Sequence, residues 1–282
     1  MIKKLLIVDD DLPFRERLSR SLEKKGFNVQ SSPSFNESIK MVNESSFDFA
    51  VVDMRLEDGS GLELVKQIQK ISPQTKIIFI ANPNNPTGTY VNETDMITLL
   101  DATSPSTMVV LDEAYAEYVD ASDYPNGLAL IKKYPNLMIT RTFSKIYGLA
   151  NLRIGYGIAQ AKVVQQIQKV RQPFNVNNLA IRAAEIALQT PDFLNQSIEL
   201  NKRGKVYLYD ALEKMALGIC KSEANFICVF LPISGDEAAK RLLEKGIIVR
   251  SLASFGLRNA IRVTIDTEKN NQRFIQTLEE SL

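Results

Sequence analysis

The chain has 282 residues, which leaves room for about two domains at roughly 150 residues per domain. Lys and Arg (34) nearly balance Asp and Glu (33), so the net charge of +1 gives no indication of a nucleic-acid or membrane partner. No apolar run reaches the roughly 20 residues of a membrane-spanning helix, and aspartates interrupt the apolar run near the N-terminus, unlike a secretory signal. We expect a soluble, cytoplasmic protein.

Histidine is absent from the sequence. This excludes Ser-His and Cys-His catalytic pairs and most zinc sites, so any proton transfer must use Lys, Tyr, Asp or Glu. The only cysteines, Cys220 and Cys228, cannot form a metal-binding quartet or a disulfide framework. Their apolar neighbours predict that both lie in the core.

Short apolar runs alternate with helical patterns over the first 170 residues. The predicted strands are residues 4–8, 27–30, 49–52, 76–80, 108–111, 137–140 and 154–158, and the predicted helices are 14–25, 35–43, 62–71, 94–100 and 161–170. Apolar strands without alternation, separated by helices, are typical of a parallel sheet covered on both faces. The pattern predicts an α/β fold in three layers with a doubly wound, mainly parallel sheet.

From residue 178 the pattern changes. The prediction is a long helical stretch over 178–216, strands at 226–231, 247–250 and 260–265, and helices at 236–245 and 268–282. This arrangement is typical of a smaller α+β domain. No long Gly, Ser or Pro linker separates the two parts, so we expect a compact boundary.

Acidic residues follow two of the predicted strands. Asp9, Asp10 and Asp11 come directly after the first strand, and Asp53 follows the third. Strand ends at one edge of a doubly wound sheet gather in one crevice, so these carboxylates should converge. Clustered carboxylates suit Mg²⁺, but an Asp run after a strand also serves as a helix N-cap and solvated turn. Both interpretations remain open at this point.

The stretches KKLLIVDDDLPFRERLSRSLEKKGFNV and FDFAVVDMRLEDGSGLELVKQI resemble the flavodoxin-like receiver domain of bacterial two-component response regulators, over about residues 1–80. The resemblance implies that Asp9, Asp10 and Asp53 hold Mg²⁺ and that Asp53 is the phosphoacceptor. Receivers carry Ser or Thr after the fourth strand and Lys after the fifth. This chain has Ala81-Asn82 and Asp112 there, so we do not expect signalling output.

Three motifs follow later strands: ANPNNPTG, VVLDEAYAEY and TRTFSKIYGLANLRIGYG. Lys145 can form a Schiff base if its surroundings favour nucleophilic attack, and Asp112 can pair with the protonated pyridine nitrogen of pyridoxal phosphate. The remaining polar groups suit a phenolic oxygen (Asn85, Tyr115) and a phosphate (Thr142, Ser144, Arg153). Taken singly, each motif also fits a turn, a capped strand end or a chance pair.

Together these motifs resemble the fold-type I pyridoxal-phosphate aminotransferases, most closely the histidinol-phosphate branch that serves histidine biosynthesis. RQPFNVN, ANF, IIVRSL and NAIRVTI extend the resemblance over about residues 77–282. It implies that Lys145 carries the cofactor and moves the substrate proton, while Asp112 binds the pyridine nitrogen. It also implies that Arg262 grips the substrate, with Arg250 and Asn175 reaching its other end.

The two resemblances meet at KIIFIANPNNPTG, which can serve as the fourth strand of either family. The N-terminal elements with which this aminotransferase family contacts substrate, phosphate and pyridine ring are not recognisable. We therefore expect a chimera with one continuous sheet of order 2-1-3-4-5-6-7. The expected segments are 1–80 (receiver-like), 81–175 (large-domain part of an aminotransferase) and 176–282 (small domain).

In such a chimera, negatively charged side chains would lie near a negatively charged cofactor. Asp9, Asp10 and Asp53 would lie close to a dianionic cofactor phosphate, so we expect weak pyridoxal-phosphate binding and weak or absent transamination. The alternatives are a Mg²⁺-binding phosphoacceptor module or a folded scaffold without activity. Small-molecule amino donors and acceptors are the expected partners, and the chain is expected to be a monomer or a homodimer.

Overall fold

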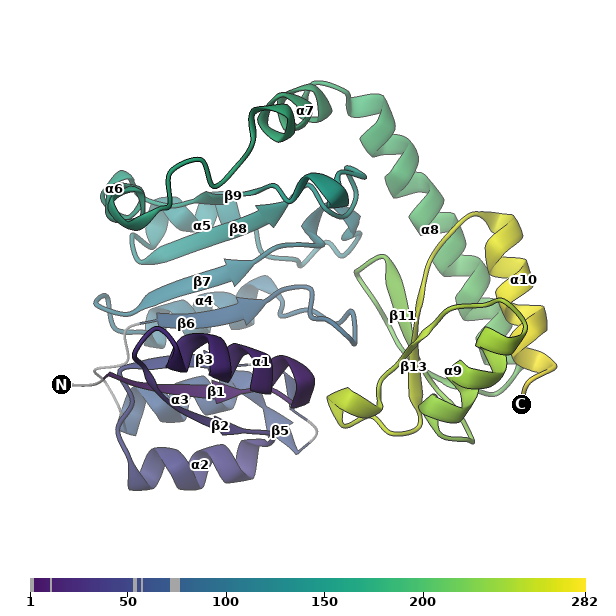
Figure 1. Cartoon of the computed structure of the whole chain (residues 1–282), viewed down its shortest axis with the longest axis horizontal. Coiled ribbons are helices and arrows are strands. Elements are labelled where there is room, and N and C mark those ends of the chain that lie inside the picture. The colour runs from purple at the N-terminus through teal and green to yellow at the C-terminus, as the bar shows by residue number, and fades with distance from the viewer. Residues whose placement is uncertain (1–2, 11, 53–54, 57, 72–76) are drawn as a thin grey trace.

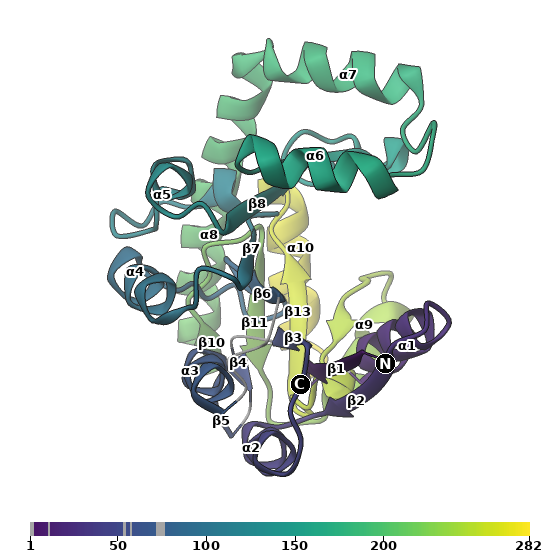
Figure 2. The same cartoon turned by 90° about the vertical axis from the view of Figure 1, so that its left-hand side faces the viewer.

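The structure is a computed structural model that describes residues 3–10, 12–52, 55–56, 58–71 and 77–282. Its N-terminal part is a parallel sheet of order β2-β1-β3, formed by β1 (Lys4–Val8), β2 (Asn28–Ser32) and β3 (Phe49–Val52). Helix α1 (Leu12–Glu23) lies on one face, and α2 (Phe35–Glu44) and α3 (Gly61–Ile71) lie on the other (Figure 2). The predicted βαβ rhythm is therefore confirmed here.

The next sheet has the order β6-β7-β8-β9. Strands β6 (Ile77–Ala81), β7 (Met108–Asp112) and β8 (Leu137–Thr142) are parallel, and β9 (Gly155–Ile158) runs antiparallel to β8. Helices α4 (Glu93–Ala102) and α5 (Gly127–Lys133) cover the same face as α2 and α3 (Figure 2), and α6 (Ala161–Val170) follows β9.

Strand β3 lies beside β6, so the strands follow the predicted spatial order 2-1-3-4-5-6-7 (Figure 1). The prediction of one continuous sheet was wrong in one respect. Among the described residues, hydrogen-bonded ladders join β1 to β3 and β6 to β7, but β3 and β6 belong to separate sheets. Buried residues of both strands belong to one hydrophobic core, so within the described residues the join between the two sheets is made by packing.

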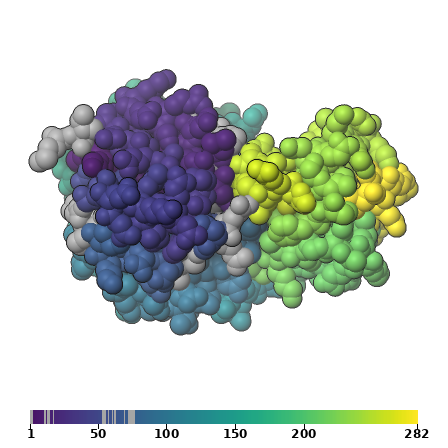
Figure 3. Space-filling view, turned by 90° about the horizontal axis from the view of Figure 1, so that it is seen from below, coloured from purple at the N-terminus to yellow at the C-terminus, as the bar shows by residue number. Residues whose placement is uncertain are grey.

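The C-terminal lobe lies beside the carboxyl ends of these strands (Figures 1 and 3). Its antiparallel sheet has the order β10-β11-β13-β12. The strands are β10 (Gly218–Cys220), β11 (Phe226–Phe230), β12 (Arg250–Ser251) and β13 (Ala260–Thr264), and the helices are α8 (Pro191–Lys214), α9 (Gly235–Glu244) and α10 (Glu268–Glu279). Helix α7 (Asn178–Leu188) lies near α6 (Figure 2), where Ala180 and Ala184 pack in one cluster with Phe143 and Ile154.

The predicted helical stretch over 178–216 is divided into α7 and α8. Pro191 begins α8, because proline lacks the backbone N–H that would continue α7 but is well suited to the first turn of a new helix. The smaller elements are the ladder of β4 (Arg55–Leu56) with β5 (Gly59–Ser60), and the 3₁₀ turns Ala116–Tyr118, Ala150–Leu152 and Ala253–Phe255.

Cys220 and Cys228 are not joined in a disulfide, and they lie opposite each other on β10 and β11. Cys228 is buried and Cys220 is half-buried, so the predicted core position holds fully for Cys228. No helix in the described part of the chain combines the length and apolar character of a membrane span. The cytoplasmic location and the segment boundaries 1–80, 81–175 and 176–282 stay predictions.

One hydrophobic core extends across the join between the two parallel sheets. It contains Leu6 and Val8 of β1, Ile78 and Ile80 of β6, and Leu111 of β7, all fully buried. Burying a side chain of this size contributes about 1.5–3 kcal/mol. The N-terminal parallel sheet and the sheet that follows it therefore stabilise each other through a common core.

We expect Ile78→Ala to lower the free energy of unfolding by about 2–5 kcal/mol, because it opens a cavity in this common core. Urea unfolding followed by far-UV circular dichroism should show one transition shifted to lower urea. Ile248→Ala, the same change at a side chain that is 85% exposed, is the matched control and should change stability little. Two resolved transitions in the Ile78→Ala variant would contradict a common core.

Candidate functional site

Lys145 lies in the loop that follows β8. Its Nζ atom is 5.0 Å from the centroid of the Tyr115 ring. Tyr115 is itself buried and packs edge-to-face on Phe226, with 5.2 Å between ring centroids. The backbone N–H of Ser144 donates to the Thr142 hydroxyl at 3.0 Å, which fixes the turn that presents Lys145. The amine is thus held against a rigid aromatic surface.

Asp112 is the last residue of β7 and is accessible from the cavity described below. The protein packed around it raises the pKa of its carboxyl group, while hydrogen bonds from the Thr140 side chain and the Ala114 backbone and the charge of Lys145 oppose that rise. Asp112 and Lys145 therefore lie close enough for their charges to interact. The structure brings the two central residues of the lysine motif together at the carboxyl ends of β7 and β8.

Arg153 and Ser144 form the polar group predicted for a phosphate. Arg153 Nη1 lies 3.3 Å from Ser144 Oγ and donates to the carbonyl oxygen of Ala150 at 2.7 Å. Arg153 adopts a left-handed backbone conformation with φ 52°, which is uncommon for a residue with a side chain. The Arg153 guanidinium therefore lies next to the Ser144 hydroxyl at the turn that carries Lys145.

Arg262 is a residue of the C-terminal lobe that contacts the site. It lies on β13, and its Nη1 donates to Oδ1 of Asn85 in the loop after β6. Its guanidinium also lies 5.0 Å from the centroid of the Phe226 ring. Burial lowers the pKa of Arg262, partly offset by Tyr115, while the nearby charge of Arg250 lowers it further. Asn85, Tyr115 and Arg262 thus form one cluster.

The other two predicted substrate residues lie differently. Arg250 is opposite Arg262 across β12 and β13, and its guanidinium lies 5.7 Å from the Phe255 ring and 3.4 Å from Ser254 Oγ. Asn175 lies in the exposed loop between α6 and α7, where its Oδ1 accepts from Arg171 at 3.3 Å. Arg250 therefore lies next to the cluster of Asn85, Tyr115 and Arg262, whereas the described contacts of Asn175 are with residues outside that cluster.

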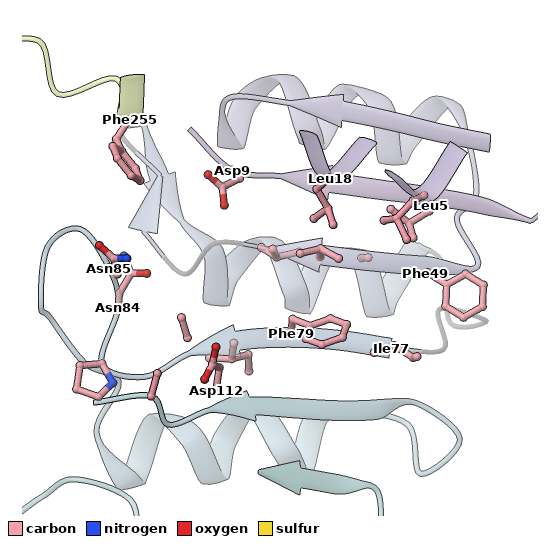
Figure 4. A pocket seen from close by; sticks show the side chains of 18 of the residues that line it. Leu5, Asp9, Leu18, Phe49, Ile77, Phe79, Asn84, Asn85, Asp112 and Phe255 are labelled. Carbon is pink, nitrogen blue, oxygen red and sulfur yellow. The ribbon is translucent and has the colours of Figure 1, made fainter. Parts of the chain in front are cut away.

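A cavity of about 730 Å³ opens at the carboxyl ends of β1, β3, β6 and β7 (Figure 4). Asp9, Asn84, Asn85 and Asp112 lie at that end of it. Asp9 lines the same cavity as Asp112, whereas the predicted approach of Asp9, Asp10 and Asp53 to a cofactor phosphate stays a prediction. The Arg15 guanidinium donates to the backbone carbonyl of Asp9.

The predicted Mg²⁺ and phosphoacceptor residues are only partly described. Asp9 and Asp10 are described, whereas Asp53, like Asp11, lies outside the described residues. Within the described ranges, no group of three or more acidic, Cys or His side chains could hold a metal ion. The assignments of Asp9, Asp10 and Asp53 to Mg²⁺ and of Asp53 to phosphorylation stay predictions.

The sequence did not reveal the ion pair beneath the site. Nε and Nη2 of Arg141 both donate to Oε2 of the fully buried Glu113, at 2.9 and 2.7 Å, and Nη1 lies 3.9 Å from Glu117. Burial raises the pKa of Glu113, Arg141 opposes this, and Glu117 and Asp112 add to it. Glu113 follows Asp112, and Arg141 precedes Thr142, so the pair joins the strand ends that carry the site. Both residues lie in the sequence motifs described above, Glu113 in DEAY and Arg141 in TRTFSK, and their opposite charges were the available sign of the pair.

Comparison with protein-family models gives a match to aminotransferase class I and II over residues 20–278. The chain is 47% identical over 221 residues to histidinol-phosphate aminotransferase 1 of Nitrosococcus oceani, covering 78% of this chain and 60% of that protein. It is 41% identical over 262 residues to the histidinol-phosphate aminotransferase of Anoxybacillus flavithermus, covering 93% of this chain and 70% of that one.

The chain spans only 60–64% of the length of three of the curated relatives that it matches. Among solved structures, histidinol-phosphate aminotransferase from Sinorhizobium meliloti, in complex with pyridoxal-5'-phosphate, superposes with a TM-score of 0.77 and 23% identity. The match covers 99% of this chain and 70% of that one. At this identity the superposition shows a common fold, and it includes the N-terminal part.

We expect Arg141→Met to lower the free energy of unfolding by about 3–5 kcal/mol at pH 8, because it leaves Glu113 buried and charged. A protonated Glu113 needs no cation, and its folded pKa is already raised, so the loss should shrink as the pH falls through that pKa. Urea unfolding at pH 8 and pH 5 measures both effects.

Two further variants sharpen this comparison. Glu113→Gln combined with Arg141→Met should regain part of the stability at pH 8, since the buried charge is gone. Arg203→Met removes the exposed ion pair with Glu199 and should cost no more than about 1 kcal/mol. A loss in Arg141→Met that is equal at both pH values would show that Glu113 charge is not its cause.

Proposed function

Since the chain belongs to the aminotransferase class I and II family, we propose that it binds pyridoxal 5'-phosphate at Lys145 and transfers an amino group between small molecules. The convergence of Lys145 and Asp112 carries this proposal: Asp112 ends β7 opposite Thr140 of β8, and Lys145, in the loop after β8, lies 5.0 Å from the ring of Tyr115, three residues after Asp112. An amine that can be attached to a carbonyl carbon and a carboxylate that can hold a protonated pyridine nitrogen are the two groups that this cofactor requires.

The donor set around these residues suits the rest of the cofactor. Ser144 and Arg153, which lie 3.3 Å apart, would hold the phosphate together with Thr142, through hydroxyl and guanidinium donors. Asn85 and Tyr115 would hold the phenolic oxygen. When bound, the cofactor supplies an electron sink that stabilises negative charge on the substrate α-carbon.

Within that site the protein performs the positioning and the proton transfer. Lys145 Nζ would take the proton from the substrate α-carbon and return it on the cofactor side, because no histidine is available and the amine is fixed over Tyr115. Asp112 would hold the pyridine nitrogen protonated. Arg262 would orient the substrate, and its contact with Asn85 ties that task to the loop after β6.

Histidinol phosphate, with glutamate as the other member of the amino-transfer pair, is the proposed substrate. The relatives named above are histidinol-phosphate aminotransferases. Arg262 and Arg250 lie opposite each other across β12 and β13, and paired guanidinium groups suit a phosphate or a carboxylate. Asn175 would reach the substrate only if the loop that carries it moves toward this pair.

We further propose that residues 1–80 are receiver-derived and that the chain is a chimera. The sequence motifs of that segment support this origin, and the common core with Ile78 and Leu111 explains how such a segment can be accommodated. Turnover is expected to be weak, because Asp9 lines the same cavity as Asp112 and its negative charge disfavours an anionic substrate in that cavity.

We also propose that the chain forms a homodimer through α6, α7 and the loop between them. Val170, Phe174 and Leu179 are 80%, 99% and 71% exposed, and Ile186 and Leu188 on α7 are more than half exposed. Apolar side chains gathered in this way on one surface indicate a protein–protein interface.

Titration with pyridoxal phosphate tests the cofactor site. We expect a saturable visible absorbance band, and borohydride reduction followed by peptide mapping should place the label on Lys145. Lys145→Ala should lose both signals, whereas Lys162→Ala, at an exposed lysine of α6, should keep them. Labelling spread over many lysines, or unchanged in Lys145→Ala, would refute the assignment.

The interface is tested by the mass in solution. We expect light scattering to give twice the chain mass of 31.6 kDa, and Phe174→Ser with Leu179→Ser to give the single-chain mass with unchanged circular dichroism. Leu243→Ser, at a side chain that is 58% exposed on α9, should leave the dimer intact. A monomeric unsubstituted chain would exclude the proposed interface.

A further inference from the structure

One face of the parallel sheets is incompletely covered. Helices α2 to α5 cover the opposite face, where Ile78 and Ile80 are fully buried. On the face that carries α1, the alternate residue Phe79 is 41% exposed although it lies in the middle of β6. Parallel sheets are normally covered on both faces, so an apolar surface remains accessible beside α1.

The 730 Å³ cavity lies over this surface, and it is elongated along the strands. Phe49 and Ile77, the first residues of β3 and β6, lie at one end, and Asn85 and Asp112 lie at the other (Figure 4). Leu18 of α1 and Phe79 line it between these ends. Its volume is in the range of small-molecule sites, and its shape suits an extended apolar ligand.

The polar groups of the cavity are gathered at one end. Among the described lining residues the charged side chains are Asp9 and Asp112, both acidic and both at the carboxyl ends of their strands. Neighbouring cations act on that end from outside the lining: Arg15 contacts the Asp9 carbonyl oxygen, and Lys145 attracts Asp112. An apolar body with acidic groups at one end is complementary to a molecule with a cationic head.

We propose that this cavity binds a primary amine that carries an extended aromatic or aliphatic group. The ammonium group lies at the acidic end, beside Asp9, and the apolar group lies along Phe79 toward Phe49. Lys145 is not among the described lining residues, but Asn85, Asp112 and Tyr115 are, and they are also assigned to the proposed cofactor site. The proposal is therefore tested on the chain without added pyridoxal phosphate, where binding of the amine does not depend on the proposed aminotransferase function.

The chain contains no tryptophan, so an indole ligand can be excited selectively and its emission observed directly. Tryptamine is the probe, tryptophol is its neutral counterpart, and indole-3-propionic acid is its anionic one. We expect a saturable blue shift for tryptamine as the indole enters the apolar cavity. Tryptophol should bind about tenfold more weakly, as for the loss of one charge-assisted hydrogen bond, and the acid more weakly still.

Three variants assign the parts of the site. Asp9→Asn should remove the preference for tryptamine over tryptophol, whereas Asp210→Asn, at an exposed carboxylate of α8, should preserve it. Phe79→Ser should weaken both ligands by a similar factor and leave their ratio unchanged. Lys145→Ala should still bind tryptamine, which separates this site from covalent cofactor attachment.

The ligand series on the unsubstituted chain is decisive even if a variant fails to fold. Equal binding of the three indoles, tighter binding of the acid, or no spectral change with tryptamine up to millimolar concentration would each overturn the proposal. Equal loss of the tryptamine preference in Asp9→Asn and Asp210→Asn would show that overall charge is responsible, and would overturn the assignment to this cavity.

Discussion

The packing of β3 against β6 determines which side chains can meet at the carboxyl edge of the sheets. The strand order around this contact places the end of β1, with Asp9, on the same edge as the ends of β6 and β7. In the part of the chain that the structure describes, no ladder joins β3 to β6, and the common core that includes Leu6, Ile80 and Leu111 spans this contact. If this core loosened, the cavity and the residues around Lys145 would no longer be held in a fixed position relative to each other.

A second constraint acts from the C-terminal lobe. Arg262 reaches Asn85, and Phe226 supports the Tyr115 ring that lies under Lys145. These contacts join residues that are more than one hundred positions apart in the chain. The antiparallel sheet of this lobe therefore completes the site instead of forming a separate one, and a change in the packing of β11 or β13 would be felt at Lys145.

The sequence predicted the elements whose signal is local. The bounds of β1, β3 and α6 were predicted correctly, the two strands from their apolar runs and the helix from its amphipathic pattern. Lys145 and Asp112 were predicted to lie near each other because both follow strands at their carboxyl ends. Short α5 was missed, because its seven residues make only about two turns, which is shorter than the window in which a helical periodicity can be recognised. The pairing of Arg141 with Glu113 also escaped prediction, since each residue alone resembles an ordinary charge beside a strand. The cavity was not foreseen, because it depends on which part of the sheet face α1 leaves uncovered.

The charge conflict expected from the sequence is reduced by the strand order. Asp9 follows β1, whereas Ser144 and Arg153 lie beyond β8, and the order β1-β3-β6-β7-β8 separates them by four strand intervals. At about 4.8 Å per interval this is about 19 Å, roughly twice the screening length at physiological ionic strength. A phosphate held by Ser144 and Arg153 would therefore experience little of the Asp9 charge. The same carboxylate lines the cavity over the sheet face, where it favours cations. The acidic run consequently affects the choice of ligand over the sheet face more than the anchoring of a cofactor phosphate.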